Sequence, residues 1–336
     1  MLETMNARTA GLGRDEVKPA IDAYQEAYDR KETEPVAKQY QTLSRHFYDL
    51  VTDFYEIGWG RSFHFAALQH GETHEESIKR QESYLSDRMS LRPGMRVVDI
   101  GCGVGGPMRY LAQITGAHIT GINIDAYQLE KAQRYNREAG LEDRCELIEA
   151  DFLDMPMSDA SFDAAYSFEA TCHAPDKRSV YSEIARVLKP GSLFACYEWC
   201  TTPSYDADNP EHRRIKCGIE RGNALSHLAS FDEVHVGLEQ SGFEVLEARD
   251  RADGVGSELP WYTPLEGGEL SLTSLPRRRY GRPIVNAITG LLELVRIAPK
   301  GTRQVSSVLN LGADALVAGG KLGIFTPIYF VVARKR

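Results

Sequence analysis

The chain has 336 residues, of which 42% are hydrophobic and 26% are charged. This composition is typical of a globular protein with a full core, and it excludes collagen-like, coiled-coil and intrinsically disordered chains. The formal net charge of −9 excludes the general basic field with which proteins hold nucleic acid, so we expect no nucleic-acid partner.

Charge is unevenly distributed along the chain. Residues 271–336 contain eleven Lys and Arg against two acidic residues, a net charge of +9, which leaves −18 for residues 1–270. No apolar run reaches the ~18 residues of a membrane-spanning helix, and the N-terminus lacks the apolar core of a signal peptide. The six cysteines form no CxxC pair, which is typical of a reduced compartment, so we expect a cytoplasmic protein.

The first 92 residues carry two helical patterns. Residues 1–34 are polar with a helical stretch at 17–30, and we interpret them as a surface arm. Apolar residues then recur at helical spacing over residues 36–53, followed by the aromatic, glycine-rich run YEIGWGRSFHFA at 55–66. This order predicts a helix that leads into a shaped loop.

Strands alternate with helices from Pro93 onwards. The sequence predicts strands at 96–100, 118–124, 145–150, 162–168, 192–199, 243–248 and 325–332, with helices at 108–114, 126–139, 178–188 and 231–240. Such alternation predicts an α/β fold whose parallel sheet is covered on both faces. The ~75 residues between the last two strands are far longer than an ordinary connection, and they predict a separate lobe.

A glycine-rich turn follows the first of these strands. Asp99 lies at the strand end, and Gly101, Cys102 and Gly103 follow in the run DIGCGVGG. Glycines allow the backbone to approach a nucleotide-like ligand closely. Together with Gly106 they also match the GxGxxG fingerprint of nicotinamide enzymes, which alone is a weak signal.

The next two strand ends separate these possibilities. A dehydrogenase would have Asp or Glu near residues 122–124, whereas this chain has Asn123, with Gln128 one helical turn later. Asp151 and Phe152 follow the third strand, where a carboxylate and a ring suit the amino group and the face of adenine; Asp151 alone is equally typical of a turn cap. The run DIGCGVGG is similar to that of S-adenosylmethionine (SAM) methyltransferases, which implies SAM as cofactor and S-adenosylhomocysteine as its product.

Four segments together resemble the sterol C-24 methyltransferases. They are YEIGWGRSFHFA, VVDIGCGVGGP, FEATCHAP at 168–175 and YEWCTT at 197–202, supported by NPEHRRI, LPWYTPL and AGGKLGIFTP in the same order over residues 40–336. The resemblance implies a seven-stranded Rossmann-like methyltransferase sheet. It also implies three parts: an N-terminal arm and cap over residues 1–82, a SAM-binding core over 83–250 and a C-terminal sterol methyltransferase lobe over 251–336.

The resemblance implies methyl transfer from SAM to the side-chain alkene of a Δ24 sterol. Attack by the alkene leaves a carbocation, which a hydride shift moves and proton loss removes. Aromatic faces stabilise such a cation without reacting with it. The motif supplies Tyr55, Trp59, Phe63 and Phe65, although such a stripe without the resemblance is more often core packing.

A general base must remove the final proton. Glu169 and His173 follow the fourth predicted strand, at the edge where α/β sheets gather their sites. Glu56, His64 and Asp125 are further ionisable residues on motif positions, as is Glu198, which equally suits a strand-end charge. The sequence does not choose the base among them, and it predicts no metal site.

Three other positions carry weaker implications. Tyr48 is placed by the resemblance near the SAM carboxylate or sulfonium, although ordinary helix packing explains it equally well. The family commonly has an aromatic residue at the position of Ile57 and an aliphatic one at that of Phe168. If both line the substrate cavity, we expect altered substrate preference and an unaltered reaction type.

The expected partners are a sterol substrate and, from the resemblance, further copies of the chain. Arg277, Arg278 and Arg279 precede an apolar stretch at 283–298. This basic lobe suits peripheral contact with an anionic membrane, and equally an amphipathic lid helix under a charged surface. Three other functions stay open: the same chemistry on squalene or a prenyl chain, methylation of nitrogen or oxygen in a small metabolite, and non-catalytic sterol binding.

Overall fold

A computed structural model describes residues 11–29, 40–252, 258–266 and 281–336. The chain divides into two compact units, each built from separate stretches of sequence. Unit 1 comprises residues 1–60, 206–226 and 262–322, and unit 2 comprises residues 61–205, 227–261 and 323–336.

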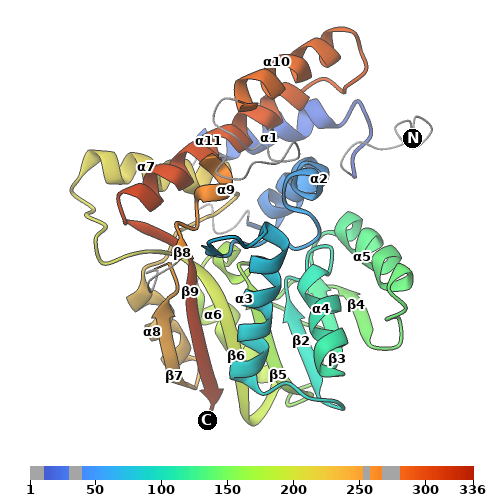
Figure 1. The fold of residues 1–336 in the computed structure, drawn as a ribbon, viewed down its shortest axis with the longest axis vertical. Helices are drawn as coiled ribbons and strands as arrows, with labels where there is room; N and C mark the ends of the chain where they lie inside the picture. Colours follow the sequence, from blue (N-terminus) through green and yellow to red (C-terminus); the bar gives the residue numbers. More distant parts are fainter. Residues whose placement is uncertain (1–10, 30–39, 253–257, 267–280) are drawn as a thin grey trace. The chain divides into compact units, whose positions relative to one another are not determined.

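Unit 2 is built on a seven-stranded sheet of order β4-β3-β2-β5-β6-β9-β7 (Figure 1). Strands β2 to β6 run parallel, and β9 runs antiparallel to both β6 and β7. The strands are β2 (Arg96–Ile100), β3 (His118–Asn123), β4 (Cys145–Glu149), β5 (Phe162–Phe168), β6 (Leu188–Thr201), β7 (Phe243–Asp250) and β9 (Phe325–Lys335). A separate pair joins β1 (Leu68–Gln69) to β8 (Glu258–Leu259). The predicted α/β fold class is confirmed, but the sheet is mixed and not purely parallel as predicted, because β9 runs antiparallel between β6 and β7.

The helices of unit 2 connect these strands. They are α3 (His74–Met89), α4 (Gly106–Thr115), α5 (Ala126–Glu138), a 3-10 turn η3 (Thr171–His173), α6 (Lys177–Val187) and α8 (Phe231–Gln240). Side chains of α6 and α8, such as Tyr181, Ile184 and Leu238, form one core with the residues of β2, β5 and β6. Because β2, β3 and β5 are parallel neighbours, their carboxyl ends meet at one edge.

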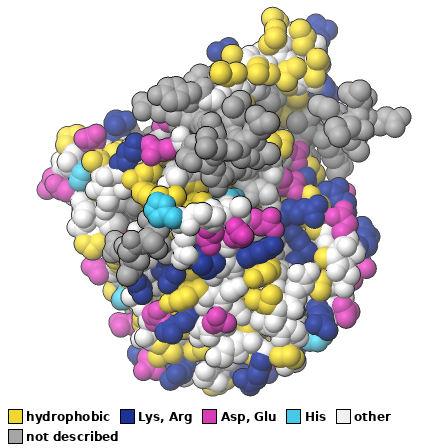
Figure 2. All heavy atoms as spheres, in the orientation of Figure 1, with side chains coloured by type: hydrophobic (Ala, Val, Ile, Leu, Met, Phe, Trp, Pro, Cys, Tyr) yellow, Lys and Arg dark blue, Asp and Glu magenta, His cyan; other side chains and the backbone are white. Residues whose placement is uncertain are grey.

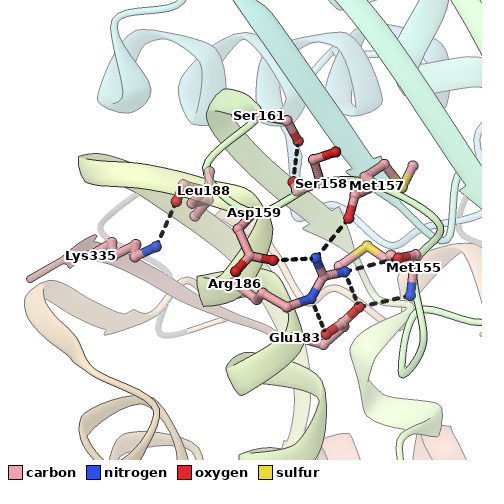
Figure 3. Close-up of polar contacts among 9 residues, drawn as sticks. All are labelled: Met155, Met157, Ser158, Asp159, Ser161, Glu183, Arg186, Leu188 and Lys335. Atoms are coloured by element: carbon pink, nitrogen blue, oxygen red, sulfur yellow. Dashed lines mark hydrogen bonds and ion pairs between the residues drawn. The ribbon is translucent and has the colours of Figure 1, made fainter.

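One guanidinium fixes the long connection between β4 and β5 to α6 (Figure 3). Arg186 donates to both carboxylate oxygens of Glu183, at 2.6 and 2.8 Å, and to the carbonyls of Met155 and Met157, at 2.9 and 2.7 Å. It also contacts Asp159 at 2.8 Å. This segment follows Asp151 and Phe152 directly, so Arg186 anchors the chain just beyond two predicted cofactor residues.

Unit 1 is helical. It contains α1 (Val17–Asp29), α2 (Tyr40–Trp59), α7 (Pro210–Gly222), α9 (Thr263–Glu266), α10 (Gly281–Leu294) and α11 (Thr302–Lys321). Side chains of α1, α2 and α11 share a core that includes Tyr24, Phe47 and Val305. The Tyr24 hydroxyl donates to the Arg221 carbonyl at 2.6 Å and accepts from the Ala224 amide. Among the described residues, no helix is both long and apolar enough to cross a bilayer.

The prediction of a loop at residues 55–66 is wrong for its first half. Helix α2 continues through Trp59 and ends at Gly60, whose φ of +82° allows the helix to stop there. The apolar helical periodicity weakens at Glu56 and Gly58. Neither residue ends the helix, because α2 is held by core contacts that include Phe54 and Tyr55. Only residues 61–67 form the connecting segment.

Helices α3, α7, α9 and α11 were not predicted. The signals for two of them are present in the sequence: Thr73 and Glu76 form a capping box, and Asn209 with Pro210 caps α7. Strands β6 and β9 are also longer than predicted. Strand β6 starts at Leu188, which pairs with Phe162 of β5, and β9 extends to Lys335, which pairs with Phe243 of β7. Arg277, Arg278 and Arg279 lie outside the described residues.

Candidate cofactor and catalytic site

The glycine turn after β2 is held against β3 by its backbone. The amides of Gly101 and Cys102 both donate to the Ile122 carbonyl, at 3.0 and 2.9 Å. Gly101, Gly103 and Gly105 have φ values of +78°, +54° and +74°, which side chains rarely adopt. A Cβ at Gly101 would lie 2.3 Å from that of Ala170, so the turn lies directly against the residue after Glu169.

Asp99, at the end of β2, is buried beneath this turn. It is 2% exposed, and the Tyr166 hydroxyl donates to its Oδ2 at 3.0 Å. Burial raises the pKa of Asp99 to about 7, although the bond from Tyr166 favours its charged form. The Cys102 thiol is also buried, which raises its pKa well above the ordinary value and leaves it protonated. The backbone amide of Cys102 already donates to the Ile122 carbonyl, so the Cys102 side chain fills space in the turn.

The end of β3 brings Asn123 and Gln128 together. The Asn123 amide donates to Gln128 Oε1 at 2.7 Å. Asp125 caps α5, because its Oδ1 accepts from the Gln128 amide at 2.9 Å. The buried Asp125 carboxylate therefore has a structural task, whereas Asn123 and Gln128 form a polar pair beside the glycine turn.

Asp151 and Phe152 follow β4 and are half-buried. Asp151 Oδ1 accepts from the Leu153 amide at 2.9 Å, which is the turn-capping role that the sequence left open. The phenyl ring of Phe152 packs against the core formed by β2, β5 and α6.

The segment after α2 lies across the glycine turn. A Cβ at Gly106 would lie 2.0 Å from the Arg61 carbonyl oxygen, and one at Gly103 would lie 3.9 Å from both Phe63 and Gln128. The Arg61 guanidinium stacks on Tyr135 of α5, 3.6 Å from the ring centroid. Residues 61–65 therefore cover the site, and Phe63 lies beside the predicted cofactor residues.

His64 is buried with an acceptor at each ring nitrogen. Nδ1 lies 3.0 Å from the Phe65 carbonyl, and Nε2 lies 3.1 Å from Glu82 Oε1, which also accepts from Ser62. A carbonyl only accepts, so Nδ1 carries a proton, and Nε2 donates to the carboxylate. Burial opposes the charge, but the hydrogen bond and the negative charge of Glu82 outweigh it and raise the pKa of His64. This arrangement favours an imidazolium.

Glu169 follows β5 in a left-handed backbone conformation with φ +55°. Its Oε1 accepts from the Phe65 amide and its Oε2 from Trp199 Nε1, both at 2.7 Å. Burial raises the pKa of Glu169 to about 8, against the positive charge of His64 and the two donors. A non-glycine residue in this conformation is strained by about 1–3 kcal/mol and is typical of functional sites.

Trp199, which donates to the Glu169 carboxylate, belongs to a group of four buried aromatic rings. Phe65 lies 5.8 Å from Trp199 and 5.1 Å from Trp261 between ring centroids, and Phe325 lies 5.4 and 5.6 Å from the two indoles. We call Phe65, Trp199, Trp261 and Phe325 the ring cluster. Of these, only Phe65 was predicted as a cation-stabilising ring.

Glu198 is part of a buried ion pair. Its Oε2 accepts from Lys177 Nζ at 2.9 Å, and its Oε1 accepts from Tyr181 at 2.8 Å and from Thr171. Lys177 also donates to the Thr171 carbonyl. The pair thus holds η3, the turn that carries His173, which is 7% exposed.

The structure places the predicted residues in two different units. Tyr48, Tyr55, Glu56 and Trp59 lie on α2 in unit 1, where Tyr48 and Tyr55 contact Phe47 edge-on. His64, Asp99, Glu169 and His173 lie in unit 2. Ile57 is 73% exposed, whereas Phe168 is buried and stacks on His64 with centroids 4.6 Å apart.

Sequence reasoning missed several side chains that complete the site. Glu82 lies on the unpredicted helix α3, and its carboxylate has no local motif. Trp199 and Trp261 stand inside the quoted motifs YEWCTT and LPWYTPL, which could have indicated them. The missed residues are Glu82, Ser62, Tyr166, Trp199, Trp261, Phe325 and Lys177.

These features fit a SAM molecule. The positive-φ glycines leave backbone room where a Cβ would collide, and polar side chains line the ends of β2, β3 and β4. Asp99 and Glu169 are buried carboxyls with raised pKa, so a nearby sulfonium would favour their charged forms. Asp99, Gly101, Gly103, Asn123, Gln128 and Asp151 are the residues of unit 2 that would hold it.

Two family models match the chain. A methyltransferase domain matches residues 98–196, and a sterol methyltransferase C-terminal model matches residues 272–335. The first runs from within β2 to within β6 and includes the glycine turn, and the second contains α10, α11 and β9.

Curated relatives match nearly the whole chain. Cycloartenol-C-24-methyltransferase 1 of rice is 45% identical over 332 residues, covering 97% of this chain and 96% of its own. Sterol 24-C-methyltransferase ERG6A of Gibberella zeae is 46% identical, covering 94% of this chain and 87% of its own. Among solved structures, geranyl diphosphate C-methyltransferase from Streptomyces coelicolor, in complex with S-adenosylhomocysteine, has a TM-score of 0.61 at 18% identity, covering 90% of this chain and 99% of its own. That likeness shows the shared fold.

Proposed function

This chain belongs to the sterol C-24 methyltransferase family, and we propose that it transfers the methyl group of SAM to C-24 of a Δ24 sterol side chain. Identity of 45% over nearly the whole length of a curated relative shows the family. The observation that carries the chemistry is Glu169, a buried carboxyl with raised pKa between the glycine turn and the ring cluster.

SAM, when bound, supplies an electrophilic methyl group on a sulfonium. The residues of unit 2 orient that group. Gly101 and Gly103 let the backbone approach, and the Asn123–Gln128 pair offers amide groups for the ribose hydroxyls. The assignments of Asp151 and Phe152 to adenine and of Tyr48 to the amino acid end remain part of this proposal.

The carbocation left on the sterol needs shelter from water and a stabilising field. We assign this role to the ring cluster, whose four side chains are only 2–8% exposed. A desolvated aromatic face contributes about 2 kcal/mol or more to a cation in contact with it. We assign the same role to Phe63, which lies beside Gly103. For Tyr55 and Trp59 the assignment depends on the sequence motif alone.

The proton released at the end of the reaction needs a base with a free acceptor position. His64 donates through both ring nitrogens, so it has no lone pair for this proton. Asp125 keeps carboxylate lone pairs although its Oδ1 caps α5, so it stays an alternative. We propose Glu169 as the base, because a carboxylate with a pKa of about 8 is more basic than an ordinary one. Glu56 and His173 remain alternatives for this step.

The test is incubation of purified protein with methyl-labelled SAM and separate alkenes, read by mass spectrometry. The panel contains cycloartenol, zymosterol, desmosterol, a 24-methylene sterol and squalene. Label in a 24-methylene product of any sterol supports the proposal, and label in a 24-methylene substrate indicates a second methylation. Label on squalene alone, or on no member while S-adenosylhomocysteine still binds, contradicts the sterol assignment.

The organisation of the chain also stays a proposal. We propose that residues 1–82 cap the substrate, 83–250 bind SAM and 251–336 complete the sterol site. Assembly into a homo-oligomer and a cytoplasmic location are proposed with it. Sedimentation velocity on the full chain tests the homo-oligomer, because a single species at monomer mass would contradict it.

A further inference from the structure

Helix α10 presents its apolar side outward. Ile284, Ile288, Leu291, Leu294 and Val295 are each 52–78% exposed. On a helix with 100° between residues these side chains fall within about one third of the circumference. Val295 and Ile297 lie just beyond the helix end. Val295 keeps the helical spacing because its amide donates to the Leu291 carbonyl, and Ile297 is 54% exposed and extends the same surface. Figure 2 shows hydrophobic side chains gathered over α10 at the top of the view.

The polar side of α10 faces its neighbouring helix α11. Glu293 Oε1 accepts from the Arg303 amide at 2.7 Å, and Asn286 donates to the Ser307 hydroxyl at 3.5 Å. A Cβ at Gly290 would lie 3.2 Å from Arg303 Cδ, and Thr289 is only 8% exposed. A surface helix of a globular protein ordinarily turns its apolar stripe to the core, and α10 does the opposite.

Basic side chains border the apolar face. Arg296, Lys300 and Arg303 are exposed at and beyond the end of α10. The exposed Arg14 donates to the Arg296 carbonyl at 2.8 Å, but the exposed Asp15 and Glu16 follow it, so that segment adds no net positive charge. Glu293 is the acidic residue of the 281–303 stretch, and its carboxylate accepts from the Arg303 backbone amide on the side of α10 that faces α11. The rim is therefore positive, which suits a partner with negative charges around an apolar interior.

We propose that α10 docks this protein on the surface of an anionic lipid bilayer. Ile284, Ile288, Leu291 and Val295 insert among the acyl chains, while Arg296, Lys300 and Arg303 contact lipid phosphates. With 14 residues, α10 is about 21 Å long and lies in the plane of the interface. A second copy of this chain is disfavoured as the occupant, because it would bring two positive rims together.

The inference goes beyond the proposed reaction and is tested without sterol. Full-length protein is floated with vesicles of phosphatidylcholine alone and with vesicles that contain about 30% phosphatidylserine. We expect wild type to float with the anionic vesicles at low salt. Ile288→Glu/Leu291→Glu should weaken this binding by about ten-fold or more, because negative charges replace two aliphatic side chains that insert into the bilayer. Arg296→Gln/Lys300→Gln should bind less and lose part of the salt dependence.

The matched control is Val236→Glu/Leu246→Glu, which places the same charges at exposed apolar positions of unit 2, 48% and 43% exposed. It should float like wild type, and circular dichroism verifies that each variant is folded. Wild type that stays unbound, or an Ile288→Glu/Leu291→Glu variant that binds undiminished, overturns the inference. The inference is also overturned if gel filtration without lipid shows wild type as a dimer and only Ile288→Glu/Leu291→Glu as a monomer, because the apolar face would then bind a second copy of the chain. Methylation of a detergent-dispersed sterol by the same samples reports separately on the proposed function.

Discussion

At the scale of single residues, His64 and Glu82 form a buried charge pair beside the site. The pair is within 3.1 Å and both side chains are almost fully buried. Because the pKa of folded His64 lies above its unfolded value of about 6.5, its contribution to stability is fully present below that pH and is lost as pH rises through the folded pKa.

Glu82→Gln should lower the pKa of His64, because the amide keeps the shape and removes the charge that favours the imidazolium. NMR titration of the His64 ring measures this directly. Ser62→Ala, which removes only a neutral donor to Glu82, is the matched control and should leave the titration near that of wild type. An unchanged titration in Glu82→Gln would mean that Glu82 does not hold the proton on His64.

Glu169 predicts the pH dependence of methyl transfer. Its pKa of about 8 means that the charged form, and with it the rate, should rise with pH towards a plateau above that value. Glu169→Gln should lower kcat by about 10²–10⁴-fold and abolish this rise. The pH profile of kcat/KM for SAM, taken between about pH 6 and pH 9, provides the measurement, because kcat/KM reports the pKa of the free enzyme before the sulfonium is bound.

Trp199→Phe is the informative companion variant for Glu169. It keeps a ring in the cluster and removes the indole donor that favours the charged carboxylate. The midpoint of the rate profile should therefore move to higher pH. A profile that is the same in wild type and Trp199→Phe would indicate that another group controls the rate.

At the scale of elements, the Arg186 contacts predict a role for a residue outside the site (Figure 3). Arg186→Met should lower the free energy of unfolding by about 2 kcal/mol, because several charge-assisted hydrogen bonds are lost at a partly exposed position. It should also weaken S-adenosylhomocysteine binding through the segment after Asp151. Asp159→Asn, whose carboxylate is 79% exposed, is the control and should change either quantity little. Urea denaturation and calorimetric titration decide both.

Helices α7 and α11 meet at two glycines. A Cβ at Gly222 would lie 2.2 Å from Gly312 Cα, so Gly222→Ala forces backbones apart and should lower the free energy of unfolding by about 1–3 kcal/mol. Gly290→Ala in α10 meets only the flexible Arg303 side chain, and helix propensity should make it neutral or stabilising by up to about 1 kcal/mol. Thermal melts of the pair test this, and equal melting of Gly222→Ala and wild type would contradict the close packing.

The elements that sequence predicted well are those with local signals. The βα alternation from β2 to β6, the glycine turn and the polar pair Asn123–Gln128 each depend on neighbours in sequence. Helix α3 escaped because its residues are mostly polar, and Glu82 escaped with it. The ring cluster joins residues 65, 199, 261 and 325, and nothing local in the sequence indicates that they meet.

At the scale of the whole molecule, the predicted site residues are divided between two units. Glycine-turn, β3 and β4 residues lie in unit 2, whereas Tyr48, Tyr55, Glu56 and Trp59 lie on α2 of unit 1. They were predicted to form one site because they occur in the motifs of one family, but a shared motif does not show that two side chains are close in space. The role of Tyr48 in cofactor binding therefore depends on the motif, while the roles of Asp99 and Gly101 also have the geometry of the turn behind them.

Hydrogen exchange with saturating S-adenosylhomocysteine separates these two kinds of assignment. At about 100 times its Kd the ligand should stabilise the binding-competent fold by about 2.7 kcal/mol. Amides of residues 100–106, 123–128 and 151–153 should then exchange more slowly, because they form the turns that would hold it. If Tyr48 also contacts the ligand, α2 should be protected as well, and Tyr48→Phe should weaken binding while Phe54→Leu on the same helix should not. Protection confined to unit 2 would remove Tyr48 from the cofactor site, and protection absent from residues 100–106 would contradict the site itself.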